Sequence, residues 1–286
     1  MSDELYRKTD MVYRMNSHNS IENIKQPVFG FTVLGSGSKG NACVIHCPQG
    51  KILLDAGFSA KELKSRLDNS RIDSRSIRAI LVTHEHEDHV RGVRVFADSM
   101  GIPLYVTPET CRVMASKKQM PEKRVLITAG CRFDLCGITV EPFSVCHDVV
   151  DAVAYTFRCG QKKLGYATDL GIVNTLVHNK LQGCDALVIE SNYDPECLRN
   201  SARPLHIKRR IMSRHGHLSN HDCMAALENL LRENTQHLVF AHLSSECNAP
   251  DIVMQMAENC LRNMNRTDVD FCVAEQGCPL NTCWLT

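Results

Sequence analysis

The sequence predicts an α/β fold in which two β-sheets pack face to face with helices on their outer sides. Its 286 residues, 43% hydrophobic and 23% charged, have the composition of an ordinary globular protein able to bury a large core. Short apolar runs typical of strands come in two series, and each series is interleaved with helix-compatible segments. No apolar run is long enough to span a bilayer, and the first residues lack the apolar core of a secretory signal, so we expect a cytoplasmic protein with no membrane partner.

The first series follows a polar stretch, residues 1–26, which we expect to be an N-terminal extension to a single domain at residues 27–286. The expected strands are Val28–Leu34, Ala42–His46, Lys51–Asp55, Ala79–Val82 and Pro103–Val106. Helices are expected at Ser59–Leu67, from Val90 onward, and at Pro108–Ser116. In the first of these, Ser59 and Glu62 have the spacing of a capping box.

The second series repeats this pattern. The expected strands are Ile138–Val145, Ala152–Arg158, Lys163–Ala167, Asp185–Ile189, Leu238–Ala241 and Val269–Val273. The expected helices are Ile207–Arg214, Ser219–Glu233 and Asp251–Met264. Two such series of strands and helices predict two layers of sheet between two layers of helix.

The stretch Thr83–His89 contains four potential metal ligands directly after an apolar strand: His84, His86, Asp88 and His89. A strand end projects His84 and His86 to the same side, because side chains two apart share a face. Imidazole and carboxylate together suit divalent zinc, manganese or iron. A solvated, histidine-rich turn is the alternative, but the density of ligands behind a buried strand favours a metal site.

Three more ligand-type residues, His147, Asp169 and His242, also follow expected strands. Alone, each histidine would be read as structural, but strand ends converge in sheet-based folds, so we expect all three near the cluster. The 15 cysteines are scattered without a CxxC pair, and we interpret them as small buried apolar residues in a reducing compartment. Metal binding by Cys43 and Cys47, or by Cys131 and Cys136, is the less favoured alternative.

The HxHxDH pattern at His84–His89 resembles that of the metallo-β-lactamase superfamily, whose fold is a four-layer αββα sandwich. The resemblance implies a site for two divalent metal ions, Zn²⁺ or Mn²⁺. It implies that His84, His86 and His147 hold one ion, that Asp88, His89 and His242 hold the other, and that Asp169 bridges them. Such a site implies hydrolysis by a metal-bound hydroxide, which Asp88 would help to orient.

Residues outside the ligand set bear on the substrate. Lys208, Arg209 and Arg210 form a basic patch suited to the phosphate backbone of a nucleic acid, although a solvated helix face is the alternative. The small-residue loop Gly35–Asn41 permits close approach of a ligand, so its polar side chains Ser36, Ser38 and Asn41 are candidate substrate contacts. Ser219 and Asn220 are further candidates, at an expected helix N-terminus where phosphate can bind.

Glu190, after one strand, and His217, before one helix, are similar to the Glu and His motifs of ribonuclease Z, which implies proton delivery to the leaving oxygen. A carboxylate beside a histidine raises its pKa and fixes its orientation, which suits a general acid. We therefore expect Glu190 to pair with His217.

Four segments together resemble the bacterial YycJ/WalJ-type (VicX) branch of the superfamily: Leu34–Ala42, Glu190–Asp194, Ile207–Ile211 and Gly216–Asn220. The resemblance implies an exonuclease that acts on DNA, with 5′ to 3′ polarity. The alternatives are a small-molecule phosphodiesterase, another hydrolase of this fold that cleaves a thioester or lactone, and a non-catalytic metal-binding regulatory protein. The oligomeric state cannot be predicted.

Overall fold

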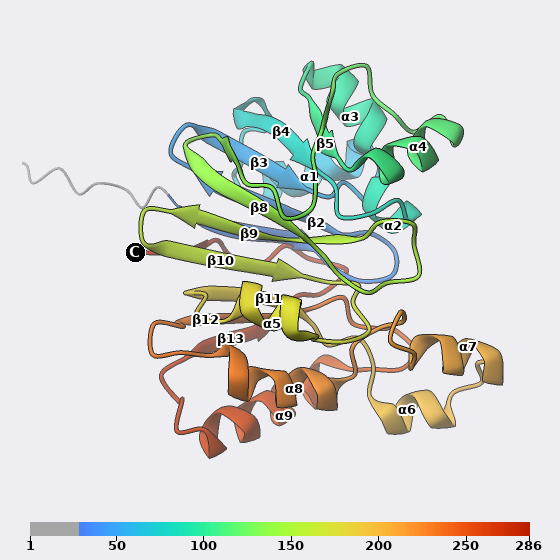
Figure 1. Ribbon diagram of the computed structural model, residues 1–286, viewed down its shortest axis with the longest axis vertical. Coiled ribbons are helices and arrows are strands. Elements are labelled where there is room, and N and C mark those ends of the chain that lie inside the picture. The colour runs from blue at the N-terminus through green and yellow to red at the C-terminus, as the bar shows by residue number, and fades with distance from the viewer. Residues whose placement is uncertain (1–28) are drawn as a thin grey trace, which may run out of the picture.

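The computed structural model describes residues 29–286. The expected N-terminal extension, residues 1–26, therefore lies outside the described residues, as does Val28 at the start of the first expected strand. The described chain forms two seven-stranded sheets with helices on both outer sides (Figure 1). This arrangement confirms the predicted αββα sandwich.

The first sheet has the strand order β14-β1-β2-β3-β4-β5-β6. Its strands are β1 (Gly30–Gly35), β2 (Ala42–Cys47), β3 (Gly50–Leu54), β4 (Ile77–Leu81), β5 (Leu104–Val106), β6 (Arg124–Leu126) and β14 (Cys283–Trp284). The strands from β3 to β6 run parallel. Its outer face is covered by α1 (Ala60–Asn69), α3 (Val93–Met100) and α4 (Pro108–Ser116).

The second sheet has the order β13-β12-β11-β10-β9-β8-β7. Its strands are β7 (Phe133–Leu135), β8 (Ile138–Ser144), β9 (Val153–Cys159), β10 (Lys162–Ala167), β11 (Ala186–Glu190), β12 (His237–Ala241) and β13 (Asp270–Val273). The strands from β10 to β13 are parallel. Its outer face is covered by α5 (Thr175–Leu181), α8 (Asn220–Leu230) and α9 (Pro250–Asn263).

Strand periodicity assigns the side chains to three separate apolar cores. In β2, Cys43 and Ile45 face the core between the sheets, whereas Ala42 and Val44 face α1 and α3. Tyr155 and Tyr166 of the second sheet are fully buried in the core between the sheets. The two outer cores join each sheet to its own helices, and the core between the sheets packs their inner faces against each other.

Several elements differ from those expected. The helix expected from Val90 begins instead at Val93 as α3, after a separate short helix, α2 (Glu87–Val90). Gly92 lies between the two and donates its backbone N–H to the Ala56 carbonyl oxygen. Ser59 and Ser219 cap α1 and α8 as their sequence positions suggest, but α8 ends at Leu230. Several short elements were not expected: β6, β7, β14, α5, α6 (Pro195–Asn200) and a 3₁₀ turn at Ser74–Ser76. The basic helix expected at Ile207–Arg214 is α7 (Leu205–Ile211).

The expectation that the cysteines are buried holds for only four of the 15, Cys43, Cys184, Cys223 and Cys247, whereas Cys131 and Cys278 are exposed and the other nine are partly exposed. All 15 cysteines fall within residues 29–286 and are free thiols there, and no cysteine belongs to a group of potential metal ligands in that range. Burial raises the pKa of the Cys43 and Cys223 thiols, which makes them poor nucleophiles. Among residues 29–286, no helix has the length and apolar character needed to cross a membrane.

Candidate metal centre and active site

The ligand-type residues meet at one edge of the sandwich, where parallel strands of both sheets end. The residues at or just beyond these strand ends are Asp55 after β3, His84 after β4, Asp169 after β10, Glu190 in β11 and His242 after β12. Because carboxyl ends of parallel strands share one edge, the topology alone gathers side chains that are far apart in sequence. His147 joins them from the loop after β8.

The backbone at three of these strand ends is left-handed. Asp55, Asp169 and His242 each have φ of 57°. Non-glycine residues rarely adopt this conformation, and such strain concentrates at functional sites because the surrounding structure must enforce it. Here it turns each side chain inward as the strand ends.

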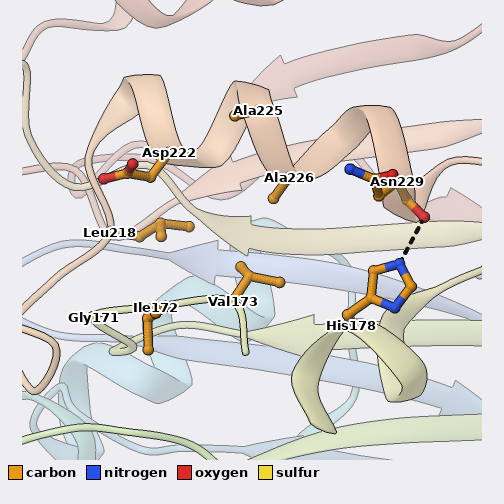
Figure 2. A pocket seen from close by; sticks show the side chains of 9 residues that line it. All are labelled: Gly171, Ile172, Val173, His178, Leu218, Asp222, Ala225, Ala226 and Asn229. Carbon is orange, nitrogen blue, oxygen red and sulfur yellow. Dashed lines mark hydrogen bonds between the residues drawn. The ribbon is translucent and has the colours of Figure 1, made fainter. Parts of the chain in front are cut away.

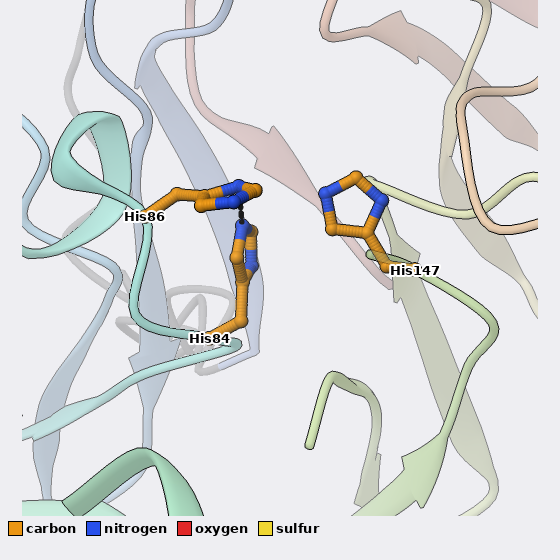
Figure 3. A group of neighbouring side chains, drawn as sticks. All are labelled: His84, His86 and His147. Atoms are coloured by element: carbon orange, nitrogen blue, oxygen red, sulfur yellow. Dashed lines mark hydrogen bonds between the residues drawn. The ribbon is translucent and has the colours of Figure 1, made fainter. Parts of the chain in front are cut away.

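The first candidate ligand group consists of His84, His86 and His147 (Figure 3). The Nε2 atom of His84 lies 3.0 Å from Nδ1 of His86, and the His147 ring centroid is 5.1 Å and 5.2 Å from the other two. The Nδ1 atom of His147 lies 3.0 Å from the Gly216 carbonyl oxygen, to which it can donate. That bond leaves Nε2 of His147 free to face the other two rings.

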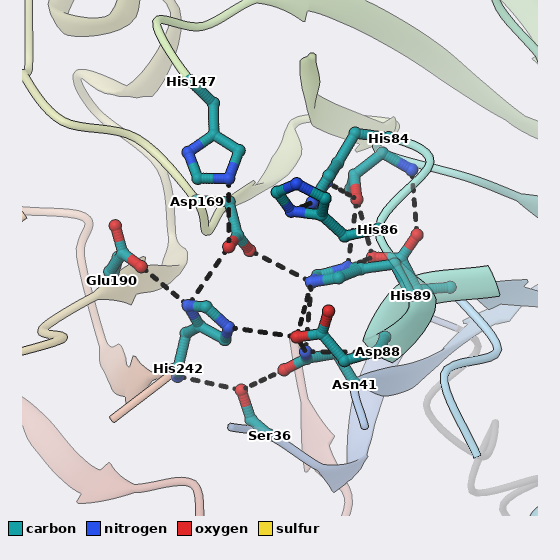
Figure 4. Close-up of polar contacts among 12 residues, drawn as sticks. Ser36, Asn41, His84, His86, Asp88, His89, His147, Asp169, Glu190 and His242 are labelled. Carbon is teal, nitrogen blue, oxygen red and sulfur yellow. Dashed lines mark hydrogen bonds and ion pairs between the residues drawn. The ribbon is translucent and has the colours of Figure 1, made fainter. Parts of the chain in front are cut away.

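The second group consists of Asp88, His89 and His242, with Asp169 between the two groups (Figure 4). Asp169 Oδ2 lies 3.2 Å from His89 Nε2, and Asp169 Oδ1 lies 3.7 Å from His147 Nε2. Nε2 of His242 lies 3.5 Å from Asp88 Oδ2. The seven side chains predicted as ligands are thus brought together in the structure.

This arrangement fits divalent cations on its own chemistry. His147 Nε2, His242 Nε2 and Asp169 Oδ2 are buried without hydrogen-bond partners among the described residues, a costly state unless a cation satisfies them. Burial alone would lower the pKa of His242, but Asp169, Asp88 and Glu190 outweigh it and raise that pKa to about 10. A site this rich in carboxylates demands positive charge, which bound cations can supply in place of protons.

Asp55 orients one of the candidate ligands but was not predicted as a site residue, because its one local signal is its position at a strand end. Its Oδ2 lies 2.8 Å from Nδ1 of His89, and both side chains are fully buried. The backbone N–H and the hydroxyl of Thr83 also donate to the Asp55 carboxylate. A carboxylate on Nδ1 fixes the tautomer in which Nε2 of His89 is free to bind a metal.

Glu190 is fully buried and joins a candidate ligand to the predicted acid. Its Oε1 lies 2.7 Å from Nδ1 of His242 and 2.9 Å from Nδ1 of His217. Its Oε2 accepts from the backbone N–H groups of Leu170 and Leu218, each at 3.0 Å. Burial alone would raise its pKa, but the contacts with His217 and His242 win and lower it to about 2.

His217 is held at the opening of the site with one ring nitrogen engaged. Burial acts to lower its pKa, but the neighbouring Glu190 carboxylate prevails and raises it. Nε2 has no hydrogen-bond partner among residues 29–286, and the side chain lines a cavity of about 120 Å³ beside the metal cluster. The structure therefore brings Glu190 and His217 together as predicted.

Comparisons with known proteins agree with this geometry. A model of the β-lactamase superfamily domain matches residues 51–243. The chain belongs to this superfamily. It is 34% identical over 224 residues to the exodeoxyribonuclease YycJ of Bacillus anthracis, covering 78% of this chain and 85% of that protein.

A second relative and a solved structure extend the comparison. This superfamily member is 33% identical over 248 residues to the exodeoxyribonuclease WalJ of Streptococcus pneumoniae, covering 85% of this chain and 92% of the relative. The metallo-β-lactamase-fold protein YhfI of Bacillus subtilis superposes with a TM-score of 0.67 at 15% identity, covering 88% and 98% of the two chains. The protein is accordingly a metal-dependent hydrolase related to the YycJ/WalJ proteins, which confirms the resemblance predicted from the motifs.

Four of the side chains predicted to contact substrate are buried in this superfamily member. Ser36 Oγ accepts from the backbone N–H of His242 and donates to Asn41, whose amide in turn donates to Asp88 (Figure 4). Ser219 caps α8. Asn220 accepts a hydrogen bond from the Ser191 hydroxyl and exchanges hydrogen bonds with the Asn248 amide. These bonds position the site loops, and substrate contact by the four stays a prediction.

The basic patch is more heterogeneous than its sequence suggests. Lys208 donates to the carbonyl oxygens of Arg199 and Ser201, and Arg210 forms an ion pair with Asp148. Arg209 is exposed. The exposed residue Ser38 lies on the wall of the 120 Å³ cavity together with Arg210 and His217.

A second cavity, of about 370 Å³, lies between the loop after β10, α5 and α8 (Figure 2). Its lining includes Val173, Ala225 and Ala226, and His178 is occupied with the carbonyl oxygen of Asn229. None of the groups of potential metal ligands in residues 29–286 includes a residue of this lining. The reactive chemistry is therefore concentrated at the strand-end cluster.

Proposed function

We propose that this protein is a dinuclear-metal exonuclease that hydrolyses phosphodiester bonds of DNA and removes nucleotides from the 5′ end. The observation that carries the proposal is the pairing of His217 with Glu190, 2.9 Å apart, at the edge of a cluster of seven metal-ligand side chains. Alkoxide leaving groups need a proton, and this pair supplies one. Two relatives at 33–34% identity are named exodeoxyribonucleases, which supports DNA as the substrate.

In this proposal His84, His86 and His147 would hold one divalent cation, Asp88, His89 and His242 would hold a second, and Asp169 would serve both. When bound, two cations of the zinc or manganese type lower the pKa of a water nucleophile and stabilise negative charge on the phosphoryl oxygens. Nitrogen and oxygen ligands in this mixture accept either metal. Asp88, which receives a hydrogen bond from Asn41 at 3.2 Å, keeps its other oxygen available to orient the nucleophile.

The protein's own side chains then control the proton that the leaving oxygen receives, on the side of the phosphorus atom opposite the nucleophile. Glu190 accepts the Nδ1 proton of His217, which leaves Nε2 as the acidic position on the cavity side. This carboxylate raises the pKa of His217, which favours the imidazolium form that a general acid needs. His217 donates its Nε2 proton to the leaving 3′ oxygen, and Glu190 stabilises the charged ring before transfer.

Phosphate contacts outside the reaction centre come from the α7 region. Arg209 is exposed, and Arg210 lies on the cavity wall beside His217. Arginine and lysine side chains placed this way bind backbone phosphates without reading sequence. We therefore expect cleavage with little base preference and affinity that falls steeply with salt.

The test is metal-reconstituted protein on a panel of end-labelled duplex DNA, RNA, bis-p-nitrophenyl phosphate and a thioester, with Asp88→Ala as the inactive control. The proposal predicts mononucleotides released from the 5′ ends of DNA. Cleavage of the thioester alone would overturn it. Equal loss of the reaction and of bound metal in His217→Ala would remove the acid role assigned to His217.

A further inference from the structure

The β1–β2 loop, residues 36–41, carries hydrogen bonds that hold the second candidate ligand group. Ser36 Oγ accepts from the backbone N–H of His242 at 2.9 Å, and Asn41 Nδ2 donates to Asp88 Oδ2 at 3.2 Å (Figure 4). The backbone N–H of Asn41 also donates to the Asp88 carbonyl oxygen at 2.7 Å. Ser36 and Asn41 are joined to each other by a side-chain hydrogen bond of 3.0 Å. The position of this ligand group therefore depends on the position of the loop.

The first candidate ligand group has no such connection to the β1–β2 loop. Among residues 29–286, the ring nitrogens of its three histidines form hydrogen bonds only with one another, with Thr83 and with the Gly216 carbonyl oxygen. A displacement of the loop should therefore disturb the second group and spare the first.

The β1–β2 loop is itself held by two consecutive residues that follow β13. The side-chain amide of Gln276 accepts from the backbone N–H of Lys39 through Oε1 and donates to the carbonyl oxygen of Gly40 through Nε2, each at 2.7 Å. Because a backbone N–H can only donate and a carbonyl oxygen can only accept, the two bonds fix the orientation of the amide. The carbonyl oxygen of Glu275 accepts from the backbone N–H of Ser36 at 3.1 Å.

The tip of the loop has little other support from the described part of the chain. Hydrogen bonds from outside the loop reach residues 37–40 from Gln276 and from Arg91, and the Arg91 bond is long, at 3.4 Å to the Lys39 carbonyl oxygen. Gly37 has φ of 145°, and a Cβ there would lie 2.8 Å from Gln276 Oε1, so the loop backbone and the amide are in close contact. Gln276 is therefore the main side-chain anchor of the tip.

We propose that Gln276 is a positioning residue for the second ligand group and acts on it through the β1–β2 loop. The proposal rests on the two-cation site of the proposed function and is independent of the substrate. Gln276 forms no hydrogen bond with a ligand side chain among residues 29–286, so its effect must pass through the loop. Anchoring the loop keeps Asp88 Oδ2 and His242 Nε2 at their separation of 3.5 Å, close enough to serve one cation.

The test titrates the metal-free protein with Mn²⁺ and follows the free ion by electron paramagnetic resonance, which yields a dissociation constant for each bound ion. Gln276→Met keeps the length of the side chain but removes both hydrogen bonds. We expect one dissociation constant to rise roughly tenfold, the lower end of the range for residues that orient metal ligands, and the other to stay unchanged.

The affected ion is assigned in two backgrounds, each of which lacks one ligand. In His86→Ala, which retains the second group, the remaining ion should still bind roughly tenfold more weakly when Gln276→Met is added. In His242→Ala, which retains the first group, the addition should have no effect.

The matched control is Thr282→Val, in the same segment that follows β13. It removes the 2.8 Å hydrogen bond between the hydroxyls of Thr282 and Thr32 and leaves the contacts of Gln276 in place, so both dissociation constants should match wild type. Hydrogen exchange of the metal-free proteins checks the loop directly. Exchange at residues 36–41 should be roughly fivefold faster or more in Gln276→Met, with no change at residues 84–86.

Each outcome of the titration decides between the proposals. Unchanged binding in Gln276→Met, or equal weakening of both ions, overturns the positioning role and leaves the two-cation site standing. A single bound ion in the wild-type protein overturns the two-cation site and the positioning role together. Selective loss of the second ion in a protein that degrades no DNA supports the positioning role and overturns the exonuclease.

Discussion

Glu190→Gln isolates the charge of the carboxylate that links His217 to His242. The substitution keeps the size of the side chain but replaces one acceptor oxygen by an NH₂ group. In the wild-type protein both oxygens of Glu190 face hydrogen-bond donors. Oε1 faces the Nδ1 atoms of the two histidines, and Oε2 accepts from the backbone N–H groups of Leu170 and Leu218. Whichever way the new amide is turned, its NH₂ group meets two groups that act as donors in the wild-type protein.

The stability lost in Glu190→Gln follows from the lowered pKa of the buried Glu190. A fall from the ordinary 4.5 to about 2 corresponds to about 3 kcal/mol of stability for the metal-free protein at neutral pH. In a protein of this size that free energy lowers Tm by about 6–12 °C. Since the folded pKa is the lower one, this stability is fully present above pH 4.5 and is lost as the pH falls toward 2. Glutamine has no such dependence.

The assay is urea unfolding of metal-free wild type and Glu190→Gln at pH 7 and at pH 3. We expect the wild type to be more stable by about 3 kcal/mol at pH 7, and the difference to shrink at pH 3. A difference of the same size at both pH values would show that the amide acts through packing and would refute the charge argument. A difference below about 1 kcal/mol at pH 7 would refute the assigned network.

Three further predictions concern groups around the site and in the core. Asp55→Asn removes the charge that orients His89 and should weaken metal affinity by roughly 10–100-fold in a chelator competition, whereas unchanged affinity would contradict the orienting role. Gly57→Ala places a Cβ 1.6 Å from the Asp88 carbonyl oxygen, so Tm should fall sharply, while the control Gly277→Ala, with open space at its Cβ, should match wild type. Labelling with a thiol reagent at pH 8 should modify the exposed Cys131 and Cys278 before the buried Cys43 and Cys223, and mass spectrometry of the order of labelling checks this.

The candidate ligands could be predicted because their chemistry is concentrated in sequence. His84, His86, Asp88 and His89 lie within six residues, and the remaining ligand-type residues each follow a recognisable apolar run. Short apolar runs likewise predicted most of the longer strands and therefore the two sheets. The order of those strands was not predicted. That the site lies where strand ends converge was expected only from the general behaviour of sheet-based folds.

Features that depend on long-range contacts could not be read from the sequence. Asp55 is an ordinary strand-end aspartate until the fold places it 2.8 Å from His89, 34 positions later. Strand β14 has only two residues and is defined by its pairing with Gly30 and Phe31 at the other end of the chain. The short helix α6 was not predicted although it has a local signal, because Asp194 followed by Pro195 is typical of a capped helix start.

The acid role of His217 is the central claim, and the leaving group tests it most directly. His217→Ala and wild type, matched for bound metal, are compared on duplex DNA and on bis-p-nitrophenyl phosphate, whose nitrophenolate departs without a proton. We predict a loss of roughly 10²–10⁴-fold in kcat on DNA, the range of general acid catalysis, and a much smaller loss on the nitrophenyl ester. Equal losses on both substrates at unchanged metal content would contradict proton donation by His217.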